Sequence, residues 1–177
     1  MAHVFVRPAT GLDARIIGAI QAQAMKEQIC RALETDLSNE THEKINADDF
    51  AHIWSETLAT LPDRHGLLVS THDGVITGFC AFAPSDKKDT FTLTSLHVDP
   101  SYTRQGHGSR LLAAAIENIK KYNGTTVEIW AFSTDDAHTS FLRSAGFAPN
   151  GVRQNIIVDN TTLTQHCWHT SIEEKEG

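Results

Sequence analysis

Two glycines separated by a single residue, Gly106 and Gly108, stand between a strand-like run, 91–98, and a strongly helical run, 109–122. Glycine lets the backbone approach a ligand closely. The first turn of a helix leaves N–H groups unpaired and carries partial positive charge. A glycine turn that opens a helix therefore predicts an anion site, for which phosphate is a suitable ligand.

Several phosphate-binding patterns compete for this window. Arg104 and Arg110 bracket the glycines and are placed to add charge-assisted hydrogen bonds. A P-loop needs a Gly-Lys pair followed by Ser or Thr, and the chain has no such pair. A dinucleotide-binding turn needs a third glycine where Leu111 stands, and it follows its strand directly, whereas seven residues separate Val98 from Gly106. An ordinary glycine cap of a helix remains the simple alternative.

A different family matches the window better. Residues 96–112 resemble motif A of the GNAT superfamily of acetyl-CoA-dependent N-acetyltransferases, where Leu-x-Val-x-Pro leads to Gln/Arg-x-x-Gly-x-Gly/Ala and a helix. Thr103 stands where that family usually has Gln or Arg. Residues 141–147 resemble its motif B, commonly Phe-Tyr-x-x-x-Gly-Phe, with Leu142 at the tyrosine position. The resemblance covers nearly the whole chain, but only residues 91–147 carry specific motifs.

The resemblance implies acetyl-CoA as cosubstrate, with no metal, and a primary amine of a small molecule or peptide as acceptor. Attack would be direct, in a ternary complex. Backbone amides of the strand before the glycines would polarise the thioester, and the glycine loop would hold pyrophosphate. The implied acetyl-CoA site comprises Leu96, His97, Val98, Thr103, Arg104, Gln105, Gly106, His107, Gly108, Ser109, Arg110, Asp135, Phe141 and Arg143.

The catalytic acid and base are the least defined part of the predicted site. Many GNAT enzymes use the motif B tyrosine to protonate the leaving thiolate, and Leu142 cannot do so. His97 stands near the implied acetyl position and has a suitable ordinary pKa of about 6.5, although it is equally a packed or exposed strand residue. His138 lies one helical turn before Leu142 and either approaches the thiol or is solvated. Asp135 either caps the short helix or meets the pantetheine.

Two other functions stay open at this point. Leu142 and the lack of a carboxylate in residues 90–98 also suit a catalytically silent acyl-CoA-binding or regulatory module. Transfer of a different acyl group is the other alternative. The acceptor itself has no sequence motif.

The strand before the glycines changes phase. Phe91 and Leu93 are apolar at odd positions, whereas Leu96 and Val98 are apolar at even positions. Because side chains alternate across a strand, one extra residue near 94–95, a β-bulge, would place all four on one face. A strand buried on both faces is the alternative. By resemblance, the bulged fourth strand splays from its neighbour, and pantetheine pairs with the freed backbone.

Apolar periodicity and turn residues place the remaining elements. We expect strands at 4–10, 67–70, 75–83, 126–132, 152–158 and 164–172, and helices at 13–29, 48–58 and 137–144. Polar residues 34–46 read as a loop. The expected fold is α/β (α+β), a GNAT fold over residues 1–177 as a single domain. Its central sheet is mixed and mostly antiparallel, of about seven strands, with helices on both faces.

Composition limits the possible partners. The net charge is −7, from 22 acidic and 15 basic residues, which lacks the basic footprint of a nucleic-acid-binding protein. No apolar run of membrane length is present. Three widely spaced cysteines suit free thiols in a reducing cytosol. His166 and His169 point to opposite faces of a strand, which argues against a metal site. We expect a cytoplasmic protein without membrane or nucleic-acid partners, and a homodimer is possible.

Overall fold

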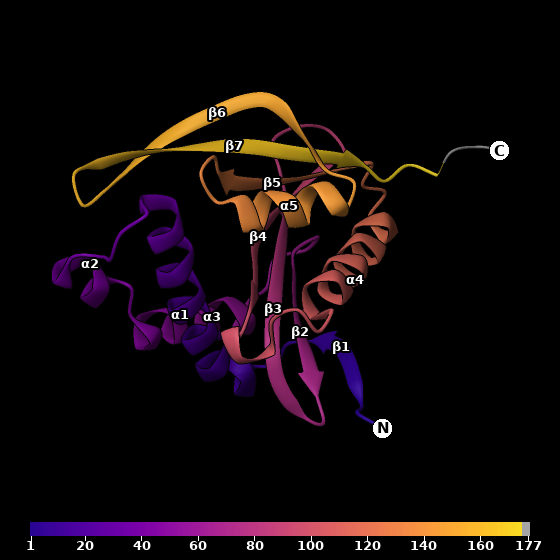
Figure 1. Cartoon of the computed structure of the whole chain (residues 1–177). Coiled ribbons are helices and arrows are strands. Elements are labelled where there is room, and N and C mark those ends of the chain that lie inside the picture. Colours follow the sequence, from indigo (N-terminus) through magenta and orange to yellow (C-terminus); the bar gives the residue numbers. More distant parts are fainter. Residues whose placement is uncertain (175–177) are drawn as a thin grey trace.

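The computed structural model describes residues 1–174 as a central sheet covered by helices (Figure 1). In these residues seven strands form one sheet in the order β1-β2-β3-β4-β5-β7-β6. The strands are β1 (Val4–Pro8), β2 (Gly66–His72), β3 (Val75–Pro84), β4 (Thr90–Val98), β5 (Thr126–Phe132), β6 (Ala148–Val158) and β7 (Thr161–Ser171). The β4–β5 pair is parallel and the other pairs are antiparallel, which confirms the predicted mixed sheet.

Helices cover both faces of the sheet, as predicted. The long helix α1 (Ala14–Leu33) and α3 (Ala47–Ala59) lie on one side, and α4 (His107–Lys121) lies on the other (Figure 1). The short helix α5 (Asp136–Ser144) shares its core with α4. Single 3₁₀ turns, η1 (Gly11–Asp13) and η2 (Pro100–Tyr102), precede α1 and α4. In residues 1–174 no helix is both long enough and apolar enough to cross a bilayer.

Each face of the sheet has its own apolar core. On the α4 face, Leu111 and Ile119 pack with Phe91 of β4 and are fully buried. On the α1 face, Ile17 and Phe79 belong to a second cluster. The two clusters clamp the central strands from both sides, so the strands that carry the site are held rigidly.

One predicted loop is wrong. Within the polar stretch 34–46 the chain forms a short helix, α2 (Asn39–Lys44). Ser38 caps it by accepting a hydrogen bond from the backbone N–H of Thr41 at 3.1 Å. Asp159, in the β6–β7 turn, accepts from the backbone N–H of Ser38 at 2.7 Å. This helix depends on its cap and on a distant turn, and its sequence has no apolar stripe from which it could be predicted.

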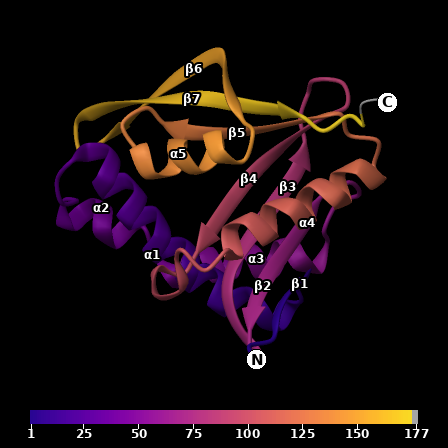
Figure 2. The same cartoon turned by 45° about the vertical axis from the view of Figure 1, so that its right-hand side comes forward.

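The fourth strand has the predicted bulge. Ala81 pairs with Ser95 while its neighbour Phe82 pairs with Leu93, so Thr94 is the extra residue. In the described chain β4 pairs with β5 only over 90–92. Beyond that point the two strands diverge (Figure 2). The bulged and splayed fourth strand is therefore confirmed, and it leaves a gap inside the sheet.

Candidate functional site

The glycine turn opens α4 as the sequence predicts. Gly106 caps the helix with φ of 83°, in the left-handed region that glycine adopts without strain. The backbone N–H of Arg110 donates to Gly106 O at 3.1 Å, which is the first turn of the helix. The amides of 107–109 precede this bond and have no helical acceptor. The Arg110 guanidinium donates to Gln105 O at 3.0 Å, which brings a cation to the loop.

His107 contributes its backbone to this turn, and its side chain lies beneath it. The imidazole is only 2% exposed and meets the rings of His72 and Tyr102 edge-on, with centroids 5.8 and 6.1 Å apart. Burial, and then the neighbouring Arg110 and His72, lower its pKa. A neutral buried ring suits a packing role, so the imidazole is not placed to meet an anion.

A cleft of about 630 Å³ opens beside the glycine turn. Its walls come from α1, the end of β4, the loop before α4, and α5. The predicted site residues that line it are Leu96, His97, Val98, Thr103, Arg104, His138 and Phe141. The structure therefore brings together residues that are more than 40 positions apart in the sequence, and the resemblance to the two motifs predicted this meeting.

A second cavity of about 450 Å³ lies where β4 and β5 separate. It is lined by α1, β4, β5 and the β6–β7 hairpin. Four residues line both cavities: Gln28, Leu96, His97 and His138. The cleft and this inner pocket therefore meet at these four side chains.

His97 faces the α1 side of the sheet. Its ring lies 5.5 Å from that of its cross-strand neighbour Phe79, whereas Leu96 and Val98 pack against the core under α4. Burial, with a smaller contribution from nearby His138, lowers the pKa of His97 to about 4. The imidazole is therefore neutral at physiological pH, well away from the ordinary pKa assumed from the sequence.

His138 is held in the cleft wall and is not a solvated surface residue. Its Nδ1 lies 3.1 Å from Gln28 Nε2. An amide nitrogen can only donate, so Nδ1 accepts and the ring proton lies on Nε2. Burial is the largest effect on this imidazole and lowers its pKa, with Asp135 opposing and Arg31 reinforcing the change. His138 is thus a neutral group with a fixed tautomer.

Asp135 ties α5 to α1. Its carboxylate accepts from the backbone N–H of His138 at 3.2 Å and so caps α5, the first of the two predicted roles. The same carboxylate, which is 1% exposed, accepts from Arg31 Nε and Nη2 at 3.1 and 3.2 Å. Both oxygens are engaged within the protein, so this residue fixes the cleft walls relative to each other.

Other predicted residues lie apart from the cleft. The Arg143 guanidinium lies over the Trp168 ring, 5.4 Å from its centroid, where it packs on β7. Leu142 is fully buried in the α4-side core. Gln105 and Ser109 lie in the loop and first helical turn, without lining either cavity among the described residues. Sequence spacing placed these residues near the site but could not orient their side chains.

The contribution of α1 to the site was not predicted from the sequence. Gln21, Met25 and Gln28 all line the inner pocket. They follow the helical spacing i, i+4, i+7, which puts them on one stripe of the helix. The sequence feature that could have indicated this pocket is the pair of amides, Gln21 and Gln28, beside the apolar face of the helix.

Comparisons with known proteins bear on the family and the fold of this chain. The model of the Acetyltransferase (GNAT) family matches residues 24–147. A Salmonella typhimurium protein, yncA, solved with its cofactor acetyl-CoA, has a TM-score of 0.71 and 18% identity over 99% of this chain and 97% of its own. A Desulfovibrio desulfuricans structure has a TM-score of 0.75 and 16% identity over 97% and 100%. The ribosomal-protein-alanine N-acetyltransferase of Brucella melitensis has a TM-score of 0.72 and 21% identity over 95% and 99%. A comparison with curated proteins finds no match.

Proposed function

The chain belongs to the acetyltransferase (GNAT) family of enzymes, and we propose that it transfers the acetyl group of acetyl-CoA to a primary amine within a ternary complex. One observation carries this proposal. A cleft that reaches Thr103 and Arg104, in the loop just before the glycine turn, meets an inner pocket at Gln28, Leu96, His97 and His138. A donor entering from the glycine turn and an acceptor in the inner pocket would therefore meet at these side chains.

The glycine turn would bind the CoA pyrophosphate. The amides of 107–109 belong to the first turn of α4 and have no acceptor within the helix, and Arg104 lines the neighbouring cleft. Pantetheine would lie along the part of β4 that β5 leaves unpaired, and the strand would accept it as an additional strand. Amides of His97 and Val98 would then polarise the thioester carbonyl.

The transfer step needs one bond formed and one broken. The amine nitrogen attacks the acetyl carbon, the carbon–sulfur bond breaks, and one amine proton is finally found on the CoA sulfur. His97, neutral and on the pocket side, accepts the proton directly or through water. His138 would stabilise the leaving sulfur with a hydrogen bond from Nε2–H. The thiolate then receives the proton that His97 accepted, directly or through water, which returns His97 to its neutral state and replaces the acid that Leu142 cannot supply. Placement of the reactants contributes several kcal/mol on its own.

The test measures thiol release from acetyl-CoA with a panel of amines, together with the thermal shift produced by CoA. Gly106→Asp adds a negative charge next to the proposed pyrophosphate site, and it also forces a non-glycine residue into a φ of 83°. The variant should therefore abolish the thermal shift with CoA and the activity. Gly151→Asp is the matched control, because its φ is 88° and the added Cβ meets nothing within 4 Å. Equal CoA shifts in the two variants would refute the phosphate assignment.

A silent acyl-CoA-binding module is the second candidate. The buried Leu142 favours it, because the position that carries the acid in many GNAT enzymes is part of the core here. A clear thermal shift with CoA, without thiol release by any amine and without slow hydrolysis of acetyl-CoA, would support this second candidate over the first.

A further inference from the structure

The inner pocket has no charged wall. Its sixteen described lining residues include no Asp, Glu, Lys or Arg. Aromatic and aliphatic side chains, among them Met25, Trp130 and Phe132, make up one part of the wall. Amides and hydroxyls, among them Gln21, Thr94 and Gln165, make up the other. A ligand of this pocket meets apolar surface and neutral hydrogen-bonding groups.

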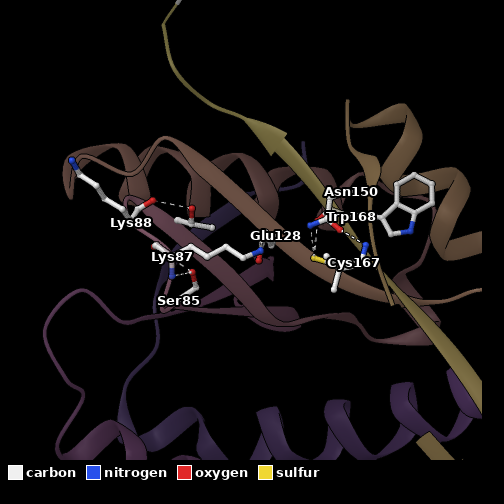
Figure 3. Close-up of polar contacts among 9 residues, drawn as sticks. Ser85, Lys87, Lys88, Glu128, Asn150, Cys167 and Trp168 are labelled. Atoms are coloured by element: carbon white, nitrogen blue, oxygen red, sulfur yellow. Dashed lines mark hydrogen bonds and ion pairs between the residues drawn. The ribbon is translucent and has the colours of Figure 1, made fainter. Parts of the chain in front are cut away.

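Two buried carboxylates that flank the pocket are already paired with cations, whereas Glu27 and Asp136 line the adjoining cleft and not the pocket. Glu128 lies opposite Thr92, at the point where β4 and β5 begin to separate. Its carboxylate accepts from Lys87 Nζ at 2.7 Å, and Figure 3 shows the lysine side chain reaching across to it. Asp135 is bound by Arg31 in the same way. Neither carboxylate is left to balance a positive charge on a ligand.

The two pocket histidines are neutral as well. Burial lowers the pKa of His97 to about 4 and also lowers that of His138. An ammonium group inside the pocket would therefore lose water without gaining a counter-ion, which costs several kcal/mol. An amine that arrives as the free base avoids this cost, and it needs no base to become a nucleophile.

Two of the three pocket amides, Gln21 and Gln165, are hydrogen-bonded through their carbonyl oxygen, whereas the third, Gln28, uses its NH₂ group on His138. Trp54 Nε1–H can only donate, and it donates to Gln21 Oε1, while the Gln21 NH₂ group gives one N–H to Met25 Sδ at 3.6 Å and keeps the other for the pocket. Gln165 Oε1 accepts from Gln154 Nε2 at 2.8 Å, which leaves the NH₂ group of Gln165 available to donate to a ligand in the pocket. Two walls of the pocket therefore offer N–H donors, and donors select a ligand that carries an accepting oxygen.

We infer that the acceptor is a weakly basic primary amine, uncharged at neutral pH, on a compact apolar body that bears a carbonyl or hydroxyl oxygen. The inference rests on the acetyl transfer proposed above and names the substrate class of that site. Polyamines and aminoglycosides, which carry several ammonium groups, do not suit a pocket without counter-ions.

The test uses two amines of nearly the same shape, 4-aminobenzamide and 4-(aminomethyl)benzamide, with spermidine as a polycation. At neutral pH the first is uncharged and the second is an ammonium. The intact enzyme should show a kcat/KM for the aromatic amine that is about tenfold or more above the values for the two cations. A higher kcat/KM for either cation would overturn the inference and leave the acetyltransferase proposal standing.

A charge variant gives a second, independent readout. Gln165→Glu keeps the hydrogen bond from Gln154 and puts a carboxylate in the pocket wall. It should shift the ratio of the two benzamides towards the ammonium by about tenfold. Gln23→Glu, on an exposed part of α1, adds the same charge outside the pocket and should leave the ratio unchanged. Equal ratios in the two variants would overturn the inference.

Binding separates this inference from the proposed function. Calorimetry with the CoA-loaded protein measures the affinity for each benzamide without any turnover. If no amine of the panel and neither benzamide is acetylated, but the neutral benzamide binds more tightly, the acetyltransferase proposal fails and the pocket inference stands. If the ammonium binds as tightly as the neutral amine, the inference fails, whatever the activity.

Discussion

The contact between α1 and α3 gives a quantitative prediction. A Cβ added at Gly18 of α1 would lie 2.5 Å from the backbone nitrogen of Ala51 and 2.6 Å from the carbonyl oxygen of Ala47, both in α3. Ordinary Cβ contacts begin at 3.4 Å. Because the obstructing atoms are backbone, Gly18→Ala cannot be relieved by rotating a side chain, and it should push α1 and α3 apart by about 1 Å.

The expected loss of stability follows from two opposing terms. Overpacking of a tight core contact costs up to about 3 kcal/mol, while replacing glycine by alanine inside a helix returns about 1 kcal/mol. Gly18→Ala should therefore lower the free energy of unfolding by about 2 kcal/mol, measured by urea denaturation. The matched control is Gly11→Ala, where the added Cβ meets nothing within 4 Å, and a change within about 0.5 kcal/mol is expected there.

The same variant tests how the inner pocket is built. Gln21, Met25 and Gln28 of α1 line that pocket, whereas the glycine turn belongs to α4 on the other face. A displaced α1 should raise the KM for the amine by a larger factor than it weakens CoA binding, because α1 forms only one wall of the cleft. Gly18→Ala with wild-type stability, or more stable than wild type, would refute the packing argument.

Three further predictions concern the cleft. Arg31→Ala should cost about 2 kcal/mol in urea unfolding, because Asp135 stays buried without its cation, whereas Arg15→Ala on an exposed turn of α1 should be neutral. Because folding lowers the pKa of His97 to about 4, the unfolded chain binds the proton first as pH falls. The contribution of His97 to the free energy of unfolding should be fully present well above pH 6.5 and should fall by about 2 kcal/mol from pH 8 to pH 5. The variant His97→Gln should show a smaller loss over this range in thermal denaturation. Leu142→Tyr should cost about 1–3 kcal/mol without raising kcat, since its side chain is fully buried, and a gain in kcat would contradict this.

The fold was predictable where local patterns determine the backbone. The change of phase between Leu93 and Leu96 predicted a bulge, because side-chain alternation in a strand is a property of neighbouring residues. Glycine turns and apolar stripes located the strands and most helices for the same reason. The short helix at 39–44 escaped prediction because its cap, Ser38, is itself held by Asp159 from the other end of the chain.

The candidate site was predictable only in part. Motif spacing placed the glycine turn and the end of β4, where the cleft is found. The bonds that shape the cleft, from Gln28 to His138 and from Arg31 to Asp135, join residues more than a hundred positions apart. No local pattern encodes such pairs. The neutral state of His97 likewise depends on burial by distant elements, so the sequence suggested an ordinary pKa.

The bulge links core packing to the site. If Thr94 stood in a regular strand, Leu96 and Val98 would face α1, and His97 would face the core under α4. The extra residue restores Leu96 and Val98 to the α4 core and turns His97 towards the inner pocket. It also lies within the stretch in which β5 no longer pairs with β4. One inserted residue therefore buries the apolar side chains in the core and places a histidine in the pocket beside the unpaired backbone. This explains why the strand keeps a bulge that disrupts its regular hydrogen bonding.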